Sequence, residues 1–234
     1  MSSKFTKRPD GRKFDETRPI EAKAGVIKKA DGSAYFRIGK TTAYAAVYGP
    51  RELHPRHMQD PKTGILRCNY NMMPFSGEDR VRPGPSRRSK EISMVTEKAL
   101  GPVLNLQDYP NAVVDVFIEL TETDAGSRCA GICAASIALA DAGIVMKDMV
   151  ASISAGVIDH NIMIDLDGDE EHIEDVDVAD IPIAMIPSTE EITLLQGDGK
   201  FTKDELLKAI ETVKPVLKKI VEIQRKTLKE KYGG

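Results

Sequence analysis

The chain has 234 residues, enough to bury a substantial hydrophobic core in one large domain or two small ones. Its 41% hydrophobic and 29% charged residues are typical of a globular protein and exclude a disordered one. The formal net charge of -3 means that any surface for a polyanion must be local. Three scattered cysteines, a polar N-terminus and the lack of a long apolar stretch predict a cytoplasmic protein without disulfides or a membrane span.

The first third of the chain is predicted to form β-structure. Gly32–Ile38 and Thr41–Tyr48 are rich in β-branched and aromatic residues, and Gly39-Lys40 between them predicts a tight hairpin. Ile65–Met73 is predicted to be a further strand. After it comes a basic, proline-rich connection at residues 77–91.

A helix, a strand and a second helix are expected next. Ser86 is predicted to cap the first helix, in which apolar residues recur at helical spacing. Ala112–Thr121 alternates between apolar and polar side chains, as in a strand with one buried face. The Ala-rich stretch from Cys129 to Met146 is predicted to be a buried helix that ends near Gly143.

The second half is predicted to repeat the order of strands followed by a helix. Strands are predicted within residues 150–166, where a turn at residues 159–161 separates two of them, and at Ile181–Ile186 and Glu191–Gln196. A capping box at residues 202–205 begins the last helix, and Pro215 predicts a kink in it. Two such rounds without a linker predict one compact α+β domain over residues 1–234.

Gly126-Ser127-Arg128 joins the end of a predicted strand to the start of a predicted helix. Unpaired backbone N–H groups at a helix N-terminus suit an anion, and Ser127 and Arg128 add a hydroxyl and a bidentate cation. The segment is therefore a candidate phosphate cradle. The alternative is an ordinary glycine turn with Ser127 as the N-cap and Arg128 at the surface.

Arg87 and Arg88 lie in the first turn of a predicted helix, where cations oppose the helix dipole. An acidic ligand would relieve this conflict, so both are candidate contacts for phosphate or an RNA backbone. Arg80 and Arg82, just upstream, extend the basic patch. A solvated basic surface is the competing interpretation.

Acidic residues precede the strand that begins at Ile181. Asp180 is expected at the strand edge, with Asp175 five residues upstream on the loop. Such a pair can share a Mg²⁺ ion or divide into metal ligand and general acid. The alternative is a solvated acidic loop, which is our interpretation of residues 168–171. Phosphate donors, paired arginines and paired carboxylates together are the groups that phosphoryl transfer requires.

Five segments of the sequence resemble the RNase PH family, in its archaeal exosome branch. They are RPDGRKFDETRPI, GSAYFRIGKTTAYAAVYGP, PSRRSKEI, TDAGSRCAGICAASIALADAG and ADIPIAMIP, spread over nearly the whole chain. The resemblance implies an RNase PH-like fold of two βαβα-like halves, similar to the second domain of ribosomal protein S5. It also implies phosphorolysis of single-stranded RNA from the 3′ end, with inorganic phosphate as co-substrate, and reverse tailing of RNA.

The resemblance also assigns roles to residues and implies partners. It implies phosphate binding by Gly126, Ser127 and Arg128, and binding of the RNA 3′ end by Arg87 and Arg88. It places Arg56 and His57 in a loop of a central pore, and makes Asp175 and Asp180 the catalytic and Mg²⁺-binding aspartates. The family usually spaces the two aspartates six apart, so Asp175 is the less certain, and Asp177 is an alternative. The implied partners are a related inactive subunit, in a ring of three heterodimers, and RNA-binding cap subunits.

Other functions remain open at this point. The chain could be a non-catalytic, RNA-binding scaffold subunit of the same ring, although such relatives typically lack the cradle or the aspartate pair. It could also be a tRNA-trimming RNase PH that acts alone. A hydrolytic nuclease fits least, because a phosphate cradle has no purpose if water attacks. The arginines of the N-terminal motif RPDGR were interpreted as structural, anchoring a neighbouring subunit.

Overall fold

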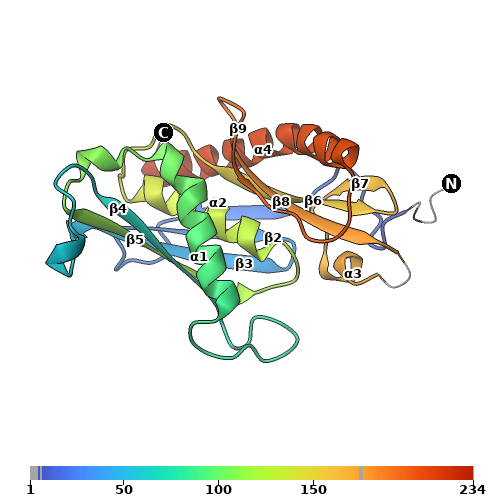
Figure 1. Cartoon of the computed structure of the whole chain (residues 1–234), viewed down its shortest axis with the longest axis horizontal. Helices are drawn as coiled ribbons and strands as arrows, with labels where there is room; N and C mark the ends of the chain where they lie inside the picture. Colours follow the sequence, from blue (N-terminus) through green and yellow to red (C-terminus); the bar gives the residue numbers. More distant parts are fainter. Residues whose placement is uncertain (1–4, 6, 174–175, 234) are drawn as a thin grey trace.

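The structure is a computed structural model that describes residue 5 and residues 7–173 and 176–233. Two β-sheets lie side by side with helices packed on and between them (Figure 1). The first sheet has the strand order β1-β2-β3-β5-β4, and the second has the order β7-β6-β8-β9. Each sheet comes from one half of the chain, as the sequence predicted.

The first sheet is antiparallel except for the parallel pair β4 and β5. Its strands are β1 (Ile20–Ala24), β2 (Gly32–Ile38), β3 (Thr41–Glu52), β4 (Ile65–Met72) and β5 (Ala112–Glu122). The predicted hairpin is confirmed, because Ile38 pairs with Thr41 across the turn. Strand β1 was not predicted; its five residues alternate between half-buried and exposed positions and lie at the sheet edge.

The second sheet is antiparallel throughout. Its strands are β6 (Ala151–Ile158), β7 (Asn161–Ile164), β8 (Val178–Ile186) and β9 (Glu191–Leu195). The 30-residue helix α4 (Lys203–Tyr232) begins with the predicted capping box and packs against this sheet. It continues through Pro215 as one helix. Among the described residues, no helix has both the length and the apolar character that a membrane span requires.

Helix α2 (Ser127–Asp141) forms the centre of the core. All its residues are buried except Arg128 and Ala140, which are half-buried. Close packing is possible because β2 starts with a glycine: a Cβ on Gly32 would lie 2.2 Å from the backbone nitrogen of Ala142. One hydrophobic cluster includes residues of both sheets, α1, α2 and α4. The division into a single domain stays a prediction, and this shared core is consistent with it.

Helix α1 (Arg87–Leu100) begins after Ser86, as predicted. The Ser86 hydroxyl accepts a hydrogen bond from the backbone N–H of Ser89, and the Ser89 side chain closes a reciprocal capping box. Three short 3₁₀ turns complete the connections, at Arg56–Met58, Gly101–Val103 and Leu106–Asp108.

The interpretation of residues 168–171 as a solvated loop was wrong. They form the short helix α3 (Gly168–Glu171), capped by Asp167 in a capping box with Glu170. The Glu170 side chain is fully buried against Arg8, at 2.6 Å between Oε2 and Nη2. An acidic run that looked solvated therefore becomes a fixed turn because one of its carboxylates has a buried cation as partner.

Candidate active site

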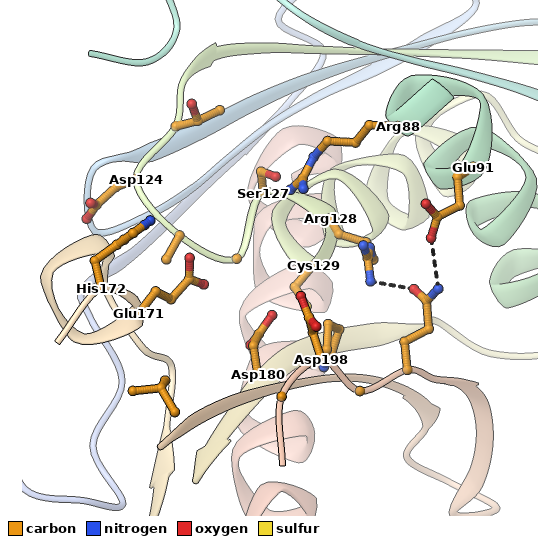
Figure 2. A pocket seen from close by; sticks show the side chains of 18 of the residues that line it. Arg88, Glu91, Asp124, Ser127, Arg128, Cys129, Glu171, His172, Asp180 and Asp198 are labelled. Carbon is orange, nitrogen blue, oxygen red and sulfur yellow. Dashed lines mark hydrogen bonds between the residues drawn. The ribbon is translucent and has the colours of Figure 1, made fainter. Parts of the chain in front are cut away.

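The largest concentration of predicted site residues lies in an open cleft of about 710 Å³ (Figure 2). The start of α2 forms one wall, and α1, α3 and β8 supply the others. Gly126, Ser127, Arg128, Arg88 and Asp180 all line this cleft. The three groups of residues that the sequence singled out separately are thus brought together by the fold.

Gly126 is the N-cap of α2 in a left-handed conformation, with φ +66°, and none of the described side chains caps the helix. The interpretation of Ser127 as the N-cap was wrong: it is the first helical residue, and its hydroxyl accepts a 2.9 Å hydrogen bond from the Tyr70 hydroxyl. The first turn of α2 contains no acidic residue. Its backbone N–H groups therefore remain available to an anion in the cleft.

Among the described residues, Gln196 forms the side-chain hydrogen bond that holds the Arg128 guanidinium. Its Nη1 donates to the side-chain oxygen of Gln196, and the Gln196 amide donates to Glu91 at 3.3 Å. The Nε of Arg128 is buried and finds no hydrogen-bond partner among the described residues. A buried N–H donor without an acceptor is costly, so a negatively charged ligand at this wall of the cleft would satisfy it.

The loop that leads into α2 is fixed by residues far away in the sequence. Arg18 donates to the carbonyl oxygen of Ala125 at 3.2 Å and to the carboxylate of Asp124 at 3.3 Å. The Thr41 hydroxyl donates to the same carbonyl oxygen at 2.7 Å. These contacts set the geometry of the cradle before any ligand binds.

Asp180 enters the cleft from β8. Its backbone exchanges two hydrogen bonds with Asp198, at 2.9 and 2.8 Å, and its carboxylate accepts a hydrogen bond from the Ser154 hydroxyl. Burial raises the pKa of Asp180, and the charge of Asp198 acts in the same direction. The Ser154 hydrogen bond and the charges of Arg128 and Arg88 oppose this rise in the pKa.

Glu171, the last residue of α3, also lines the cleft, although the sequence analysis placed it in solvent. Burial, followed by the charge of Asp180, raises the pKa of Glu171 to about 7. The charges of His172, Arg18 and Arg88 lower it. The sequence signal that was missed is Asp167-x-x-Glu170, a capping-box pattern that predicts a helical turn here.

Asp175, predicted as the first catalytic aspartate, lies outside the described residues. Asp177, the alternative, does not line the cleft; it is exposed and pairs with Lys200 at 3.4 Å. Its exposure is explained by its place just before β8, on the side that faces α4 rather than α2.

Most of the predicted RNA-binding residues are exposed and lie outside the cleft lining. Arg88 lines the cleft, whereas the adjacent Arg87 does not. Arg80 and Arg82 are exposed in the loop before α1. Arg56 and His57 are exposed in the 3₁₀ turn between β3 and β4. These positions suit a surface that meets a strand before it enters the cleft, but this role stays a prediction.

One cluster of three carboxylates, Asp10, Asp167 and Glu170, has metal-like spacing, yet it lies beside two arginines. Arg8 and Arg12 pair with these acids at 2.6 to 3.6 Å. Two cations already neutralise the cluster, which argues against a metal ion there. Arg8 is 1% exposed and donates hydrogen bonds to the Glu170 carboxylate and to the carbonyl oxygens of Ile164 and Asp165, which gives it a structural role within this chain. The expectation that the arginines of the N-terminal motif anchor a neighbouring subunit stays a prediction.

The three cysteines are buried free thiols, as expected. Burial raises the pKa of Cys129 to about 12 and keeps the thiol protonated at neutral pH. A Mg²⁺ ion fits better at Asp180, because this metal needs only one or two carboxylates when substrate phosphates complete its coordination. Asp198, which exchanges two backbone hydrogen bonds with Asp180, adds a second carboxylate to the same part of the cleft.

Comparisons with known proteins show which family this chain belongs to. The profile of the 3′ exoribonuclease family, domain 1, matches residues 16–145, and that of domain 2 matches residues 148–213. "Exosome complex component Rrp41" of Thermococcus kodakarensis is 54% identical over 97% of this chain and 90% of its own length. The protein of the same name from Nitrosopumilus maritimus is 48% identical over 97% of this chain and 92% of its own length.

Solved structures share the fold. A crystal structure of rice Rrp46 superposes with a TM-score of 0.82 at 23% identity, covering 94% of this chain and all of the other. An Archaeoglobus fulgidus exosome chain, in a structure with RNA bound to the active site, gives 0.78 at 21% identity and covers 92% of each chain. The predicted RNase PH-like α+β fold is therefore confirmed. The chain belongs to the RNase PH family of 3′ exoribonucleases.

Proposed function

We propose that this chain is the catalytic subunit of an exosome-type ring and that it shortens RNA from the 3′ end with inorganic phosphate instead of water. The buried Nε of Arg128, which lacks a hydrogen-bond partner among the described residues, carries the proposal. It lies beside the uncapped N-terminus of α2, so two kinds of unpaired donor meet in one cleft. Water does not need such donors, whereas a phosphate ion uses them all.

Phosphate bound at Gly126, Ser127 and Arg128 attacks the phosphorus of the last phosphodiester bond. A new P–O bond forms, the bond to the preceding 3′ oxygen breaks, and a nucleoside diphosphate leaves. The 3′ oxygen of the shortened RNA takes up a proton from a carboxyl group in the cleft. Arg88 balances the charge on the reacting phosphates, and the reverse reaction adds nucleotides from nucleoside diphosphates.

Mg²⁺ is proposed as a cofactor, held by Asp180 together with oxygens of the substrate phosphates. When bound, it would neutralise charge on the reacting phosphoryl group. The described residues contribute an oriented ligand for it, since Ser154 fixes the Asp180 carboxylate by a hydrogen bond.

The assembly is proposed from the relatives, which are named as exosome components. The partners are single-stranded RNA, a related inactive RNase PH-like subunit in a ring of three heterodimers, and RNA-binding cap subunits in the cytoplasm. Five predicted RNA-binding residues are exposed and therefore accessible to RNA: Arg56, His57, Arg80, Arg82 and Arg87. Because this chain has a net charge of -3, a partner subunit that supplies further basic groups would strengthen the binding of RNA.

A product assay tests the proposed reaction. The chain with its partner subunit is incubated with 5′-labelled single-stranded RNA, with and without inorganic phosphate and Mg²⁺. We expect phosphate-dependent shortening and nucleoside diphosphate products, which the Asp180→Ala variant loses. Asp177→Ala is the matched control, because Asp177 is an exposed aspartate outside the cleft lining. Shortening without phosphate, or a fully active Asp180→Ala variant, would contradict the proposal.

The ring has a separate test. The purified chain alone should be weakly active or inactive, and activity should appear when the related subunit is added. Sizing by analytical ultracentrifugation should show the corresponding change in mass. Full activity of a proven monomer would contradict the ring.

A further inference from the structure

We propose that Glu171 supplies the second carboxylate of the reaction centre, beside Asp180, in the role that the family resemblance implied for Asp175. The inference rests on the proposed phosphorolysis, for which it names a further catalytic residue. Three structural observations carry it: the place of Glu171 in the cleft, the anchoring of its helix, and the lack of another partner for its carboxylate.

Glu171 lies in the cleft with the phosphate cradle. It is half-buried at the end of α3, whereas its neighbour Glu170 points away and is fully buried. Figure 2 shows Glu171 and Asp180 reaching the cleft from different elements, both below Ser127 in this view. A phosphate bound at the start of α2 would therefore lie next to the carboxylates of Glu171 and Asp180.

The position of Glu171 is fixed by contacts on both sides of α3. The backbone N–H of Gly168 donates to the carboxylate of Asp124 at 3.2 Å, which joins α3 to the loop that forms the cradle. On the other side, the Glu170 carboxylate accepts two hydrogen bonds from Arg8, at 2.7 and 2.6 Å. Because α3 is hydrogen-bonded to the loop that forms the cradle, the Glu171 carboxylate is held at a fixed distance from a phosphate bound there. A reacting group must be positioned in this way.

No structural task accounts for the Glu171 carboxylate. Within the described part of the chain, no donor forms a hydrogen bond or an ion pair with it, although Asp167 and Glu170 in the same turn both pair with arginines. The charged groups that face it are Asp180 from β8, Arg88 from α1, Arg18 from the N-terminal segment, and His172. An acid placed opposite another acid, without a partner of its own, is the arrangement expected of a proton donor.

Asp180 and Glu171 have different roles in the proposed reaction. Asp180 accepts a hydrogen bond from Ser154 and lies near the cation of Arg128, and both oppose the rise in its pKa that burial causes. Among the described residues, no donor forms such a hydrogen bond with Glu171, and burial, followed by the charge of Asp180, raises its pKa to about 7. In the reaction Glu171 gives this proton to the departing 3′ oxygen, and the product RNA leaves with a free 3′ hydroxyl.

The test compares three substitutions in the full-length chain assembled with its partner subunit. Single-turnover rates on 5′-labelled RNA are measured at saturating phosphate for wild type, Glu171→Gln, Glu171→Asp and the control Asp177→Asn. We expect Glu171→Gln to react about 100-fold more slowly or worse, because general acid catalysis is worth that much. Glu171→Asp should recover part of the rate, and Asp177→Asn should stay close to wild type, because Asp177 is exposed and does not line the cleft.

A catalytic role also predicts a pattern that a structural role does not. Glu171→Gln should bind RNA with the wild-type Kd and should melt no lower than wild type. The wild-type rate should fall as the pH rises above about 7, and this fall should be absent in the residual rate of Glu171→Gln.

The possible outcomes separate this inference from the proposed function. An active wild type with an equally active Glu171→Gln variant would overturn the role of Glu171 alone. A wild type without phosphate-dependent shortening would overturn both.

Discussion

Replacing Arg18 with methionine is expected to weaken folding, because it removes the main cation beside a buried carboxylate. Asp165 is 2% exposed and accepts hydrogen bonds from Arg18 at 2.7 and 3.0 Å. Loss of one partner from a buried pair costs about 3–5 kcal/mol, since the other charge is left uncompensated. Arg12 lies 3.6 Å from the same carboxylate and compensates for part of the loss. We therefore expect the lower end, about 3 kcal/mol.

Urea unfolding at pH 7 measures the loss for the Arg18→Met variant of the isolated chain. The matched control is Arg51→Met, which removes another arginine–aspartate pair, but an exposed one: Arg51 and Asp31 are 57% and 47% exposed. The control should change the free energy of unfolding by less than about 1 kcal/mol. A double variant that also carries Asp165→Asn should regain part of the loss, because it removes the stranded charge.

The same variant has a functional consequence. Arg18 also holds the carbonyl oxygen of Ala125, so its loss frees the loop before α2 and should raise the KM for phosphate more than it lowers kcat. Two results would refute the reasoning: a loss of stability no larger than that of Arg51→Met, or a double variant no more stable than Arg18→Met alone.

Three further predictions concern the cleft. Because the pKa of Glu171 is raised from 4.5 to about 7, its contribution to stability is present below pH 4.5 and is lost as the pH rises to about 7. The urea midpoint of Glu171→Gln at pH 8 should therefore exceed that of wild type, and equal midpoints would count against the raised pKa. Gly126→Ala and Gly143→Ala both force a side chain into a left-handed conformation, at φ +66° and +74°, and should each cost about 1 kcal/mol in urea unfolding. Only Gly126→Ala should raise the KM for phosphate; a similar rise in both would argue against the cradle. Arg128→Lys keeps the charge but loses the planar fork, so phosphate titrations should show about tenfold weaker binding, and wild-type affinity would contradict the role of Nε.

The sequence predicted the elements whose signals are local. The hairpin of β2 and β3, the Ser86 cap of α1 and the alternation of β5 each depend on residues close to one another in the chain. The candidate site was predicted in part for the same reason: Gly126, Ser127 and Arg128 lie at a strand-to-helix junction that the sequence reveals directly.

The rest of the site depends on contacts between distant residues. Glu171 looked like part of a solvated acidic run, because its burial follows from the pairing of Glu170 with Arg8, 162 residues earlier in the chain. Gln196, which holds Arg128, and Tyr70, which holds Ser127, carry no local signal of their role at all. The helical start of α3 could have been predicted from its capping box; the direction of its side chains could not.

The N-terminal segment links these distant contacts into one arrangement. Arg8 and Arg12 bind the turn that carries Glu171, while Arg18 binds Asp165 at the end of β7 and Asp124 before α2. The segment therefore connects the second half of the chain, which supplies Glu171 and Asp180, to the loop before α2. None of the three arginines lines the cleft, but their hydrogen bonds and ion pairs hold elements that do. The proposed phosphate cradle and the proposed proton donor lie in different halves of the chain, so a segment that contacts both halves fixes their relative positions.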